Sequence, residues 1–260
     1  MTTALADGWV MTGRYLRHVV REPEQIILYF SLPIMFTLVF GYVFGSGMAV
    51  GGVSYREFLL PGVFVMTQLY GLGATATAIS LDINRGVVDR FRSMPTARSA
   101  LMVGRSTADL VRALIEMAVL LTCGVLVGWQ AHRGIGMALA AIGLILLLRL
   151  ALTWVGMYLG SVVPNPDTVS LIVFPLAFPL TALSNVFVAP EQMPAWLGAI
   201  SQWNPISATV AAARELFGNP GLGSDAWPAE NAILLAVVWP LALIAIFAPL
   251  AVRRYRLLGK

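Results

Sequence analysis

The chain has 260 residues, of which 58% are hydrophobic and 12% are charged, and its formal net charge is +4. Soluble globular domains average about 45–50% apolar and about 25% charged residues, so this composition indicates an integral membrane protein. At ~20 residues for each spanning helix, the length accommodates about six spans and no additional soluble domain. Lys260 is the only lysine. A P-loop needs an interior lysine to reach nucleotide phosphates, so this chain is not itself a P-loop motor.

Catalytic and metal chemistry finds little support in the sequence. Cys123 is the single cysteine and lies in an apolar run, which excludes a disulfide within the chain. His18 and His132 lie outside the long apolar segments, and no HExxH or GxSxG motif is present. We therefore expect no catalytic residue and no metal site, and we disfavour an intramembrane enzyme.

Residues 1–22 are predicted to form an amphipathic helix on the membrane surface. Wound as a helix, this segment places Arg14 and Arg21 nearly opposite Trp9. The arginines would face anionic headgroups, which makes membrane lipid a partner. The segment has no continuous apolar core, so we expect no cleaved signal peptide. Pro23 then ends the helix and turns the chain into the bilayer.

A transmembrane domain covering residues 23–256 is predicted to contain six spans. By apolar length these spans cover residues 25–46, 57–80, 106–129, 135–162, 168–188 and 229–251. Twelve of the 17 basic residues precede the first span, separate the second from the third, or follow the sixth. Basic residues mark cytoplasmic connections, so both termini are predicted to be cytoplasmic.

The connection at 81–105 is too elaborate for a simple turn. It mixes several charges with apolar Val87, Val88, Phe91 and Met94 at helical spacing. A charged cytoplasmic segment with an apolar stripe can lie on the membrane or fit a partner's groove.

The outer stretch 189–217 is apolar enough to enter the bilayer, but prolines interrupt it too often for it to cross. We expect short re-entrant or interfacial helices with tryptophans at headgroup depth. The residues expected to form an outer gate are Pro190, Pro194, Trp196, Trp203 and Pro205.

Several short motifs resemble the permease subunits of type-2 ABC exporters, and within them the daunorubicin-resistance group. The cytoplasmic connection contains DINRG at 82–86, DRFRSMP at 89–95 and GR at 104–105. The outer stretch contains FVAP at 187–190, MPAW at 193–196, WNP at 203–205 and AR at 213–214. EPEQ at 22–25 and LPIMF at 32–36 resemble the daunorubicin permeases in particular. The likeness covers nearly the whole chain but does not identify a substrate.

The resemblance implies an all-α integral membrane fold with six transmembrane helices. An N-terminal interface helix, a cytoplasmic coupling helix and extracellular re-entrant helices before the last span would complete it. Two permeases, identical or paralogous, would pair, and two separate ATPase subunits carrying ATP and Mg²⁺ would dock in the cytoplasm. The chain itself would bind no cofactor and no nucleic acid. The residues expected to couple to the ATPase are Asp82, Arg85, Gly86, Asp89, Arg90, Phe91, Arg92 and Pro95.

The predicted function is therefore ATP-driven export of a drug-like or lipid-like compound across the cytoplasmic membrane. Export of a polysaccharide or glycolipid by the same scaffold is an alternative. An ion-gradient-driven transporter is another, because it would use buried ionisable groups, and a membrane anchoring protein without transport is a third.

Charged residues also occur inside the third and fourth predicted spans. Asp109, Arg112 and Glu116 share one helix face at spacings that permit ion pairs. Arg149 lies near the middle of the fourth span, at a depth close to that of Glu116. We predict a Glu116–Arg149 pair that joins the two spans. The alternative is that Arg149 faces the transport pathway and contacts an anionic substrate.

Overall fold

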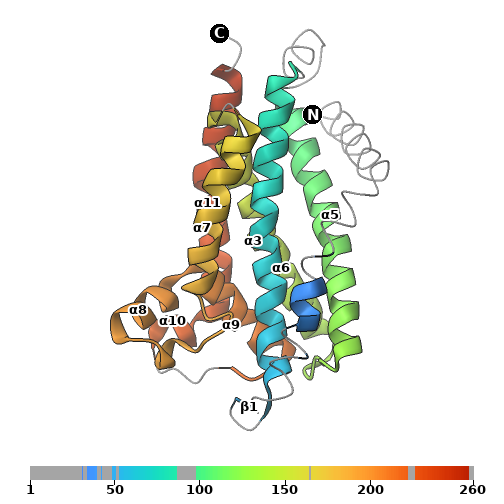
Figure 1. The fold of residues 1–260 in the computed structure, drawn as a ribbon, viewed down its shortest axis with the longest axis vertical. Coiled ribbons are helices and arrows are strands. Elements are labelled where there is room, and N and C mark those ends of the chain that lie inside the picture. The colour runs from blue at the N-terminus through green and yellow to red at the C-terminus, as the bar shows by residue number, and fades with distance from the viewer. Residues whose placement is uncertain are drawn as a thin grey trace.

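A computed structural model of the protein describes residues 31, 34–39, 42, 49–50, 53–86, 98–163, 165–221 and 226–257. Its long helices run side by side along the long axis of the molecule (Figure 1). They are α3 (Tyr55–Asn84), α5 (Arg98–Val127), α6 (Gly134–Val162), α7 (Pro166–Ala182) and α11 (Ala232–Leu257). Within the described residues, four of them are long and apolar enough to cross a membrane, and α7 is a shorter apolar helix.

The two ends of the bundle differ in structure. In the part of the chain that the structure describes, four short helices gather at one end, which we call the α8–α10 end (Figure 1). They are η2 (Pro190–Gln192), α8 (Ala195–Trp203), α9 (Pro205–Phe217) and α10 (Trp227–Glu230). The opposite end holds the last turns of α3 and α11 (Figure 1) and carries Arg85, Arg105, Arg253 and Arg254. We call it the Arg-rich end.

Five predicted spans correspond to observed helices, with shifted boundaries. The predicted span 106–129 is α5, which begins at Arg98. The first turns of α5 are polar, so the length of the apolar segment alone placed the start of the helix too late. The predicted span 168–188 was wrong at its end, because α7 stops at Ala182. There the Asn204 side chain donates a hydrogen bond of 2.8 Å to the Leu180 carbonyl oxygen, in place of another helical turn.

Most residues of the two N-terminal segments predicted from the sequence lie outside the part of the chain that the structure describes. The interface helix 1–22 lies outside the described residues, as does most of the span 25–46, of which residues 34–39 are helical. The all-α prediction missed one small feature. Strands β1 (Ala49–Val50) and β2 (Val53–Ser54) pair antiparallel. The Gly51-Gly52 dipeptide between them in sequence is typical of a two-residue hairpin.

Helices α3 and α6 pack closely against each other. A Cβ atom added at Gly156 would lie 2.8 Å from the Leu72 carbonyl oxygen, and one added at Gly160 would overlap the Ala76 carbonyl oxygen. Glycine therefore lets the two backbones touch directly, as small residues do in membrane helix pairs. The buried side chains around this contact form the main apolar core of the bundle.

Arg149 of α6 is inserted against α3 in the same interface. Its side chain is only 2% exposed, and its Nη1 atom donates a hydrogen bond of 3.1 Å to the Gln68 carbonyl oxygen. The guanidinium occupies the space that a Cβ atom at Gly71 would need. Arg149 thus joins α6 to α3, a contact that the sequence did not indicate. Its pairing with Glu116 of α5 stays a prediction.

The close approach of α3 and α6 at Gly160 can be tested by substitution. Gly160→Ala should destabilise the detergent-solubilised protein by ~1–3 kcal/mol, because the new methyl group forces the two backbones apart. Gly143→Ala is the matched control on the same helix, since a Cβ there meets nothing within 4 Å. It should be neutral or slightly stabilising. Thermal unfolding measures both, and equal stability of the two variants would contradict the close approach.

The predicted Glu116–Arg149 pair is tested by a double-mutant cycle. Glu116→Gln and Arg149→Gln should each lower the unfolding temperature, and the double variant should lose less than the sum of both. Strict additivity would exclude the pair. Unchanged stability with loss of transport would instead favour contact between Arg149 and a substrate.

Candidate functional site

Helix α3 leads directly into the segment predicted to couple to an ATPase. Asp82 lies in its last turn, and Arg85 and Gly86 follow in a turn at the Arg-rich end. Gly86 has φ 64°, a left-handed conformation that favours glycine and ends the helix. The other predicted coupling residues, Asp89, Arg90, Phe91, Arg92 and Pro95, lie outside the described residues.

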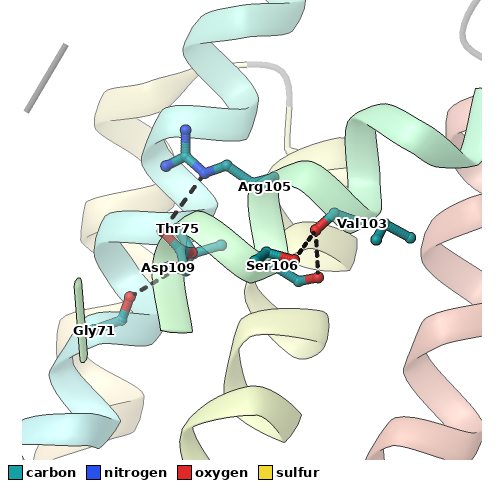
Figure 2. A network of polar contacts seen from close by, with 7 residues as sticks. Gly71, Thr75, Val103, Arg105, Ser106 and Asp109 are labelled. Carbon is teal, nitrogen blue, oxygen red and sulfur yellow. Dashed lines mark hydrogen bonds and ion pairs between the residues drawn. The ribbon is translucent and has the colours of Figure 1, made fainter. Parts of the chain in front are cut away.

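A polar contact joins α3 to α5 shortly after this segment. Figure 2 shows Asp109 of α5 between Thr75 of α3 and Arg105 of its own helix. The Thr75 hydroxyl donates to Asp109 Oδ2 at 2.5 Å, and Arg105 Nε lies 3.6 Å from Asp109 Oδ1. Asp109 is 5% exposed, so its carboxylate is buried with both contacts in place. The four-residue spacing of Arg105 and Asp109 is visible in the sequence, but their link to Thr75 is not.

The prolines of the outer stretch break it into separate helices, as predicted. Pro190 begins η2, Pro194 precedes α8, and Pro205 is the first residue of α9. The Asn204 side chain caps α9 by accepting a hydrogen bond of 2.9 Å from the Ile206 backbone nitrogen. Gly218, with φ 74°, ends that helix.

Arg214 of α9 fastens this outer stretch to the first turns of α3. Its Nε atom donates to the Phe58 carbonyl oxygen at 2.8 Å, and its Nη2 atom donates to the Val186 carbonyl oxygen at 3.1 Å. The guanidinium carbon lies 3.8 Å from the centre of the Phe58 ring, a cation–π contact. Burial lowers the pKa of Arg214 to about 9, and Tyr55 opposes that shift, so the group remains charged at neutral pH.

A second set of contacts supports the same junction. The Tyr55 hydroxyl donates to the Phe187 carbonyl oxygen at 3.3 Å. A Cβ atom at Gly62 would lie 3.0 Å from the Val186 carbonyl oxygen, so α3 lies directly against the chain that leaves α7. The outer stretch is therefore packed onto α3 at the α8–α10 end.

The predicted gate tryptophans lie on the surface of the α8–α10 end. Trp196 is 68% exposed and Trp203 is 53% exposed. Trp203 stacks on Trp227 of α10 with ring centres 6.0 Å apart. The structure thus brings Trp203 together with a third exposed tryptophan that the sequence analysis did not include. Among the described residues, no group of three or more His, Cys, Asp or Glu side chains could hold a metal ion.

Among the described residues, those predicted for coupling and those predicted for the outer gate lie at opposite ends of the molecule. The described coupling residues lie at the Arg-rich end, and the gate residues lie at the α8–α10 end. Helix α3 connects them, and Arg149 contacts its middle. The sequence analysis included Arg214 only in the motif at 213–214 and did not predict its burial against Phe58, because one arginine in an outer connection resembles an ordinary surface charge.

The chain is similar to a known protein family and to named members of it. The family model for the ABC-2 type transporter matches residues 7–217. The chain is 34% identical over 235 residues to the daunorubicin resistance ABC transporter permease protein DrrB1 of Streptomyces coeruleorubidus, covering 90% of this chain and 80% of that protein.

More distant relatives agree with this match. The probable doxorubicin resistance ABC transporter permease protein DrrC of Mycobacterium tuberculosis is 26% identical, covering 92% of this chain and 88% of that protein. The putative transport permease ycf38 of Cyanophora paradoxa is 23% identical, covering 83% of this chain and 75% of that protein. By these matches and by its apolar helices, the chain belongs to the ABC-2 type transporter family, as a non-catalytic permease subunit whose ATPase is a separate chain.

Proposed function

We propose that this permease exports an amphipathic, drug-like compound out of the cytoplasm. Relatives named for daunorubicin and doxorubicin resistance support this substrate class. The main structural support for the proposed mechanism is the position of α3. This one helix runs from the predicted coupling segment to the outer stretch that Arg214 fastens.

In this proposal, the Arg-rich end faces the cytoplasm and both termini lie there. The distribution of basic residues supports that orientation in the cytoplasmic membrane. Two ATPase subunits carrying ATP and Mg²⁺ contact segment 82–95, and a second permease, identical or paralogous, completes the pathway. The six-span count, with re-entrant helices before the last span, is part of the same proposal.

Helix α3 would transmit the movement of the ATPase. Its 30 residues extend ~45 Å, about the full thickness of a bilayer. Asp109 holds its cytoplasmic half to α5, and Arg214 holds its outer end to α9. A displacement of segment 82–95 therefore reaches the outer stretch 189–217 through one continuous helix, and that stretch acts as the exit gate.

Transport in a reconstituted system tests the proposed function. With its cognate ATPase in proteoliposomes, the permease should move doxorubicin only when ATP is supplied, and doxorubicin should stimulate ATP turnover. Uptake driven by an ion gradient without ATP would instead favour a secondary transporter. ATP turnover that responds to a glycolipid but not to doxorubicin would favour the glycolipid alternative.

The coupling segment is tested by Phe91→Asp. A carboxylate on its apolar stripe should prevent insertion into an apolar groove of the ATPase, because burying the charge is costly. The variant should insert normally while the ATPase no longer co-purifies. Phe91→Leu is the control and should keep association. Normal co-purification of the ATPase with Phe91→Asp would contradict the coupling role.

The outer gate is tested by thiol labelling in a Cys123→Ala background. Ala199 is exposed on α8, whereas Ser201 on the opposite face is fully buried. A membrane-impermeant thiol reagent should label Ala199→Cys quickly and Ser201→Cys slowly at rest. Trapping the transport cycle with ATP and vanadate should speed the labelling of Ser201→Cys. Equal, state-independent labelling of both positions would indicate an exposed loop.

A further inference from the structure

A cavity of about 420 Å³ opens at the α8–α10 end. Its walls come from the turn between α5 and α6, from η2, and from α8, α9 and α10. Small-molecule sites commonly have volumes of about 300–1,000 Å³, so the space is large enough for a ligand. Among the described residues, no residue of the coupling segment lines this cavity, whereas Arg214, which contacts α3, does.

A buried positive charge lines the cavity. Arg214 is only 1% exposed, and its Nε and Nη2 atoms are engaged by backbone carbonyl oxygens. Within the described residues, its Nη1 atom makes no hydrogen bond, and no carboxylate lies within ion-pair distance of the guanidinium. A buried charge without a counter-charge is costly, and an anion in the cavity would remove that cost.

The exposed residues of the cavity wall carry mostly negative charge, unlike the buried Arg214. Glu191 and Glu215 both line the cavity and both are exposed, together with the exposed Arg133. His132 also lines it, and its ring nitrogen lies 3.0 Å from a Glu57 carboxylate oxygen. The exposed part of the lining therefore carries an excess of negative charge. It favours a cationic group, whereas the buried Arg214 favours an anionic one.

Exposed tryptophans near the cavity indicate that its ligand is a lipid headgroup. Trp196, Trp203 and Trp227 are all more than half exposed at the same end of the molecule. Exposed tryptophans are enriched at the depth of lipid headgroups. The cavity thus lies beside a surface suited to the headgroup layer.

We propose that the cavity binds a phosphate–ammonium zwitterion, as found in the headgroup of phosphatidylethanolamine. The phosphate lies against Arg214, and the ammonium lies against Glu191 and Glu215. Since Arg214 also holds α9 to α3, the bound headgroup stabilises the junction between the outer stretch and the central helix. The site lies in the outer stretch that the proposed function makes the exit gate, but lipid binding is measured without transport, so the two proposals can fail separately.

Binding is measured on the purified, delipidated permease in detergent. Dioleoylphosphatidylethanolamine should raise the unfolding temperature at concentrations about tenfold lower than dioleoylphosphatidylglycerol does. The double variant Glu191→Gln, Glu215→Gln should lose this preference, whereas Glu230→Gln, an exposed carboxylate of α10 outside the cavity, should keep it. Equal binding of both lipids by the unaltered protein would overturn the proposal.

A cavity-filling variant gives an independent test, because Arg214→Gln risks loss of folding. Ala229→Phe, on the short helix α10, should abolish the effect of phosphatidylethanolamine while leaving the unfolding temperature without lipid unchanged. Soluble glycerophosphoethanolamine should compete with the lipid, which shows that the headgroup is recognised. Undiminished lipid binding by Ala229→Phe, or no competition by the soluble headgroup, would overturn the site.

Discussion

The direct approach of α3 to α6 is the constraint on which the rest of the bundle depends. Gly156 and Gly160 bring α6 against the backbone of α3, and Gly71 provides the space for the Arg149 guanidinium. In a bilayer, apolar burial does not drive helices together, so close packing and interhelical hydrogen bonds must do so. This interface supplies both, and α7, α9 and α11 pack around the pair it forms.

In the proposed mechanism, the position of α3 would let two distant segments act together. At the Arg-rich end the helix continues into the coupling segment, and at the α8–α10 end its first turns accept the hydrogen bond from Arg214. Because α6 supports the middle of α3, the proposed mechanism requires that this support keeps the helix from bending, so that a push on one end would be transmitted to the other. The buried contacts of Asp109 and Arg214 hold α3 to two further neighbours: Asp109 of α5 binds Thr75 within the stretch that α6 supports, and Arg214 of α9 binds Phe58 near the start of the helix.

The sequence predicted those features that depend on local composition. Apolar length found α6 almost to the residue, and the prolines of the outer stretch marked the starts of η2 and α9. Features that depend on distant partners were missed. The end of α7 is set by a hydrogen bond from Asn204, and the burial of Arg214 depends on Phe58, 156 residues earlier in the chain. The Arg105–Asp109 spacing could have been found, but not its contact with Thr75.

The direct contact between α3 and α6 predicts that the two helices move as one unit, and a distance between spin labels on them tests this. Labels at Leu81→Cys on α3 and Leu139→Cys on α6, in a Cys123→Ala background, occupy exposed positions toward opposite ends of the pair. In the complex with its ATPase, the account predicts one narrow distance distribution that is the same without nucleotide and after trapping with ATP and vanadate. A shift approaching one helical turn, about 5.4 Å, would show that the helices slide and would contradict the account.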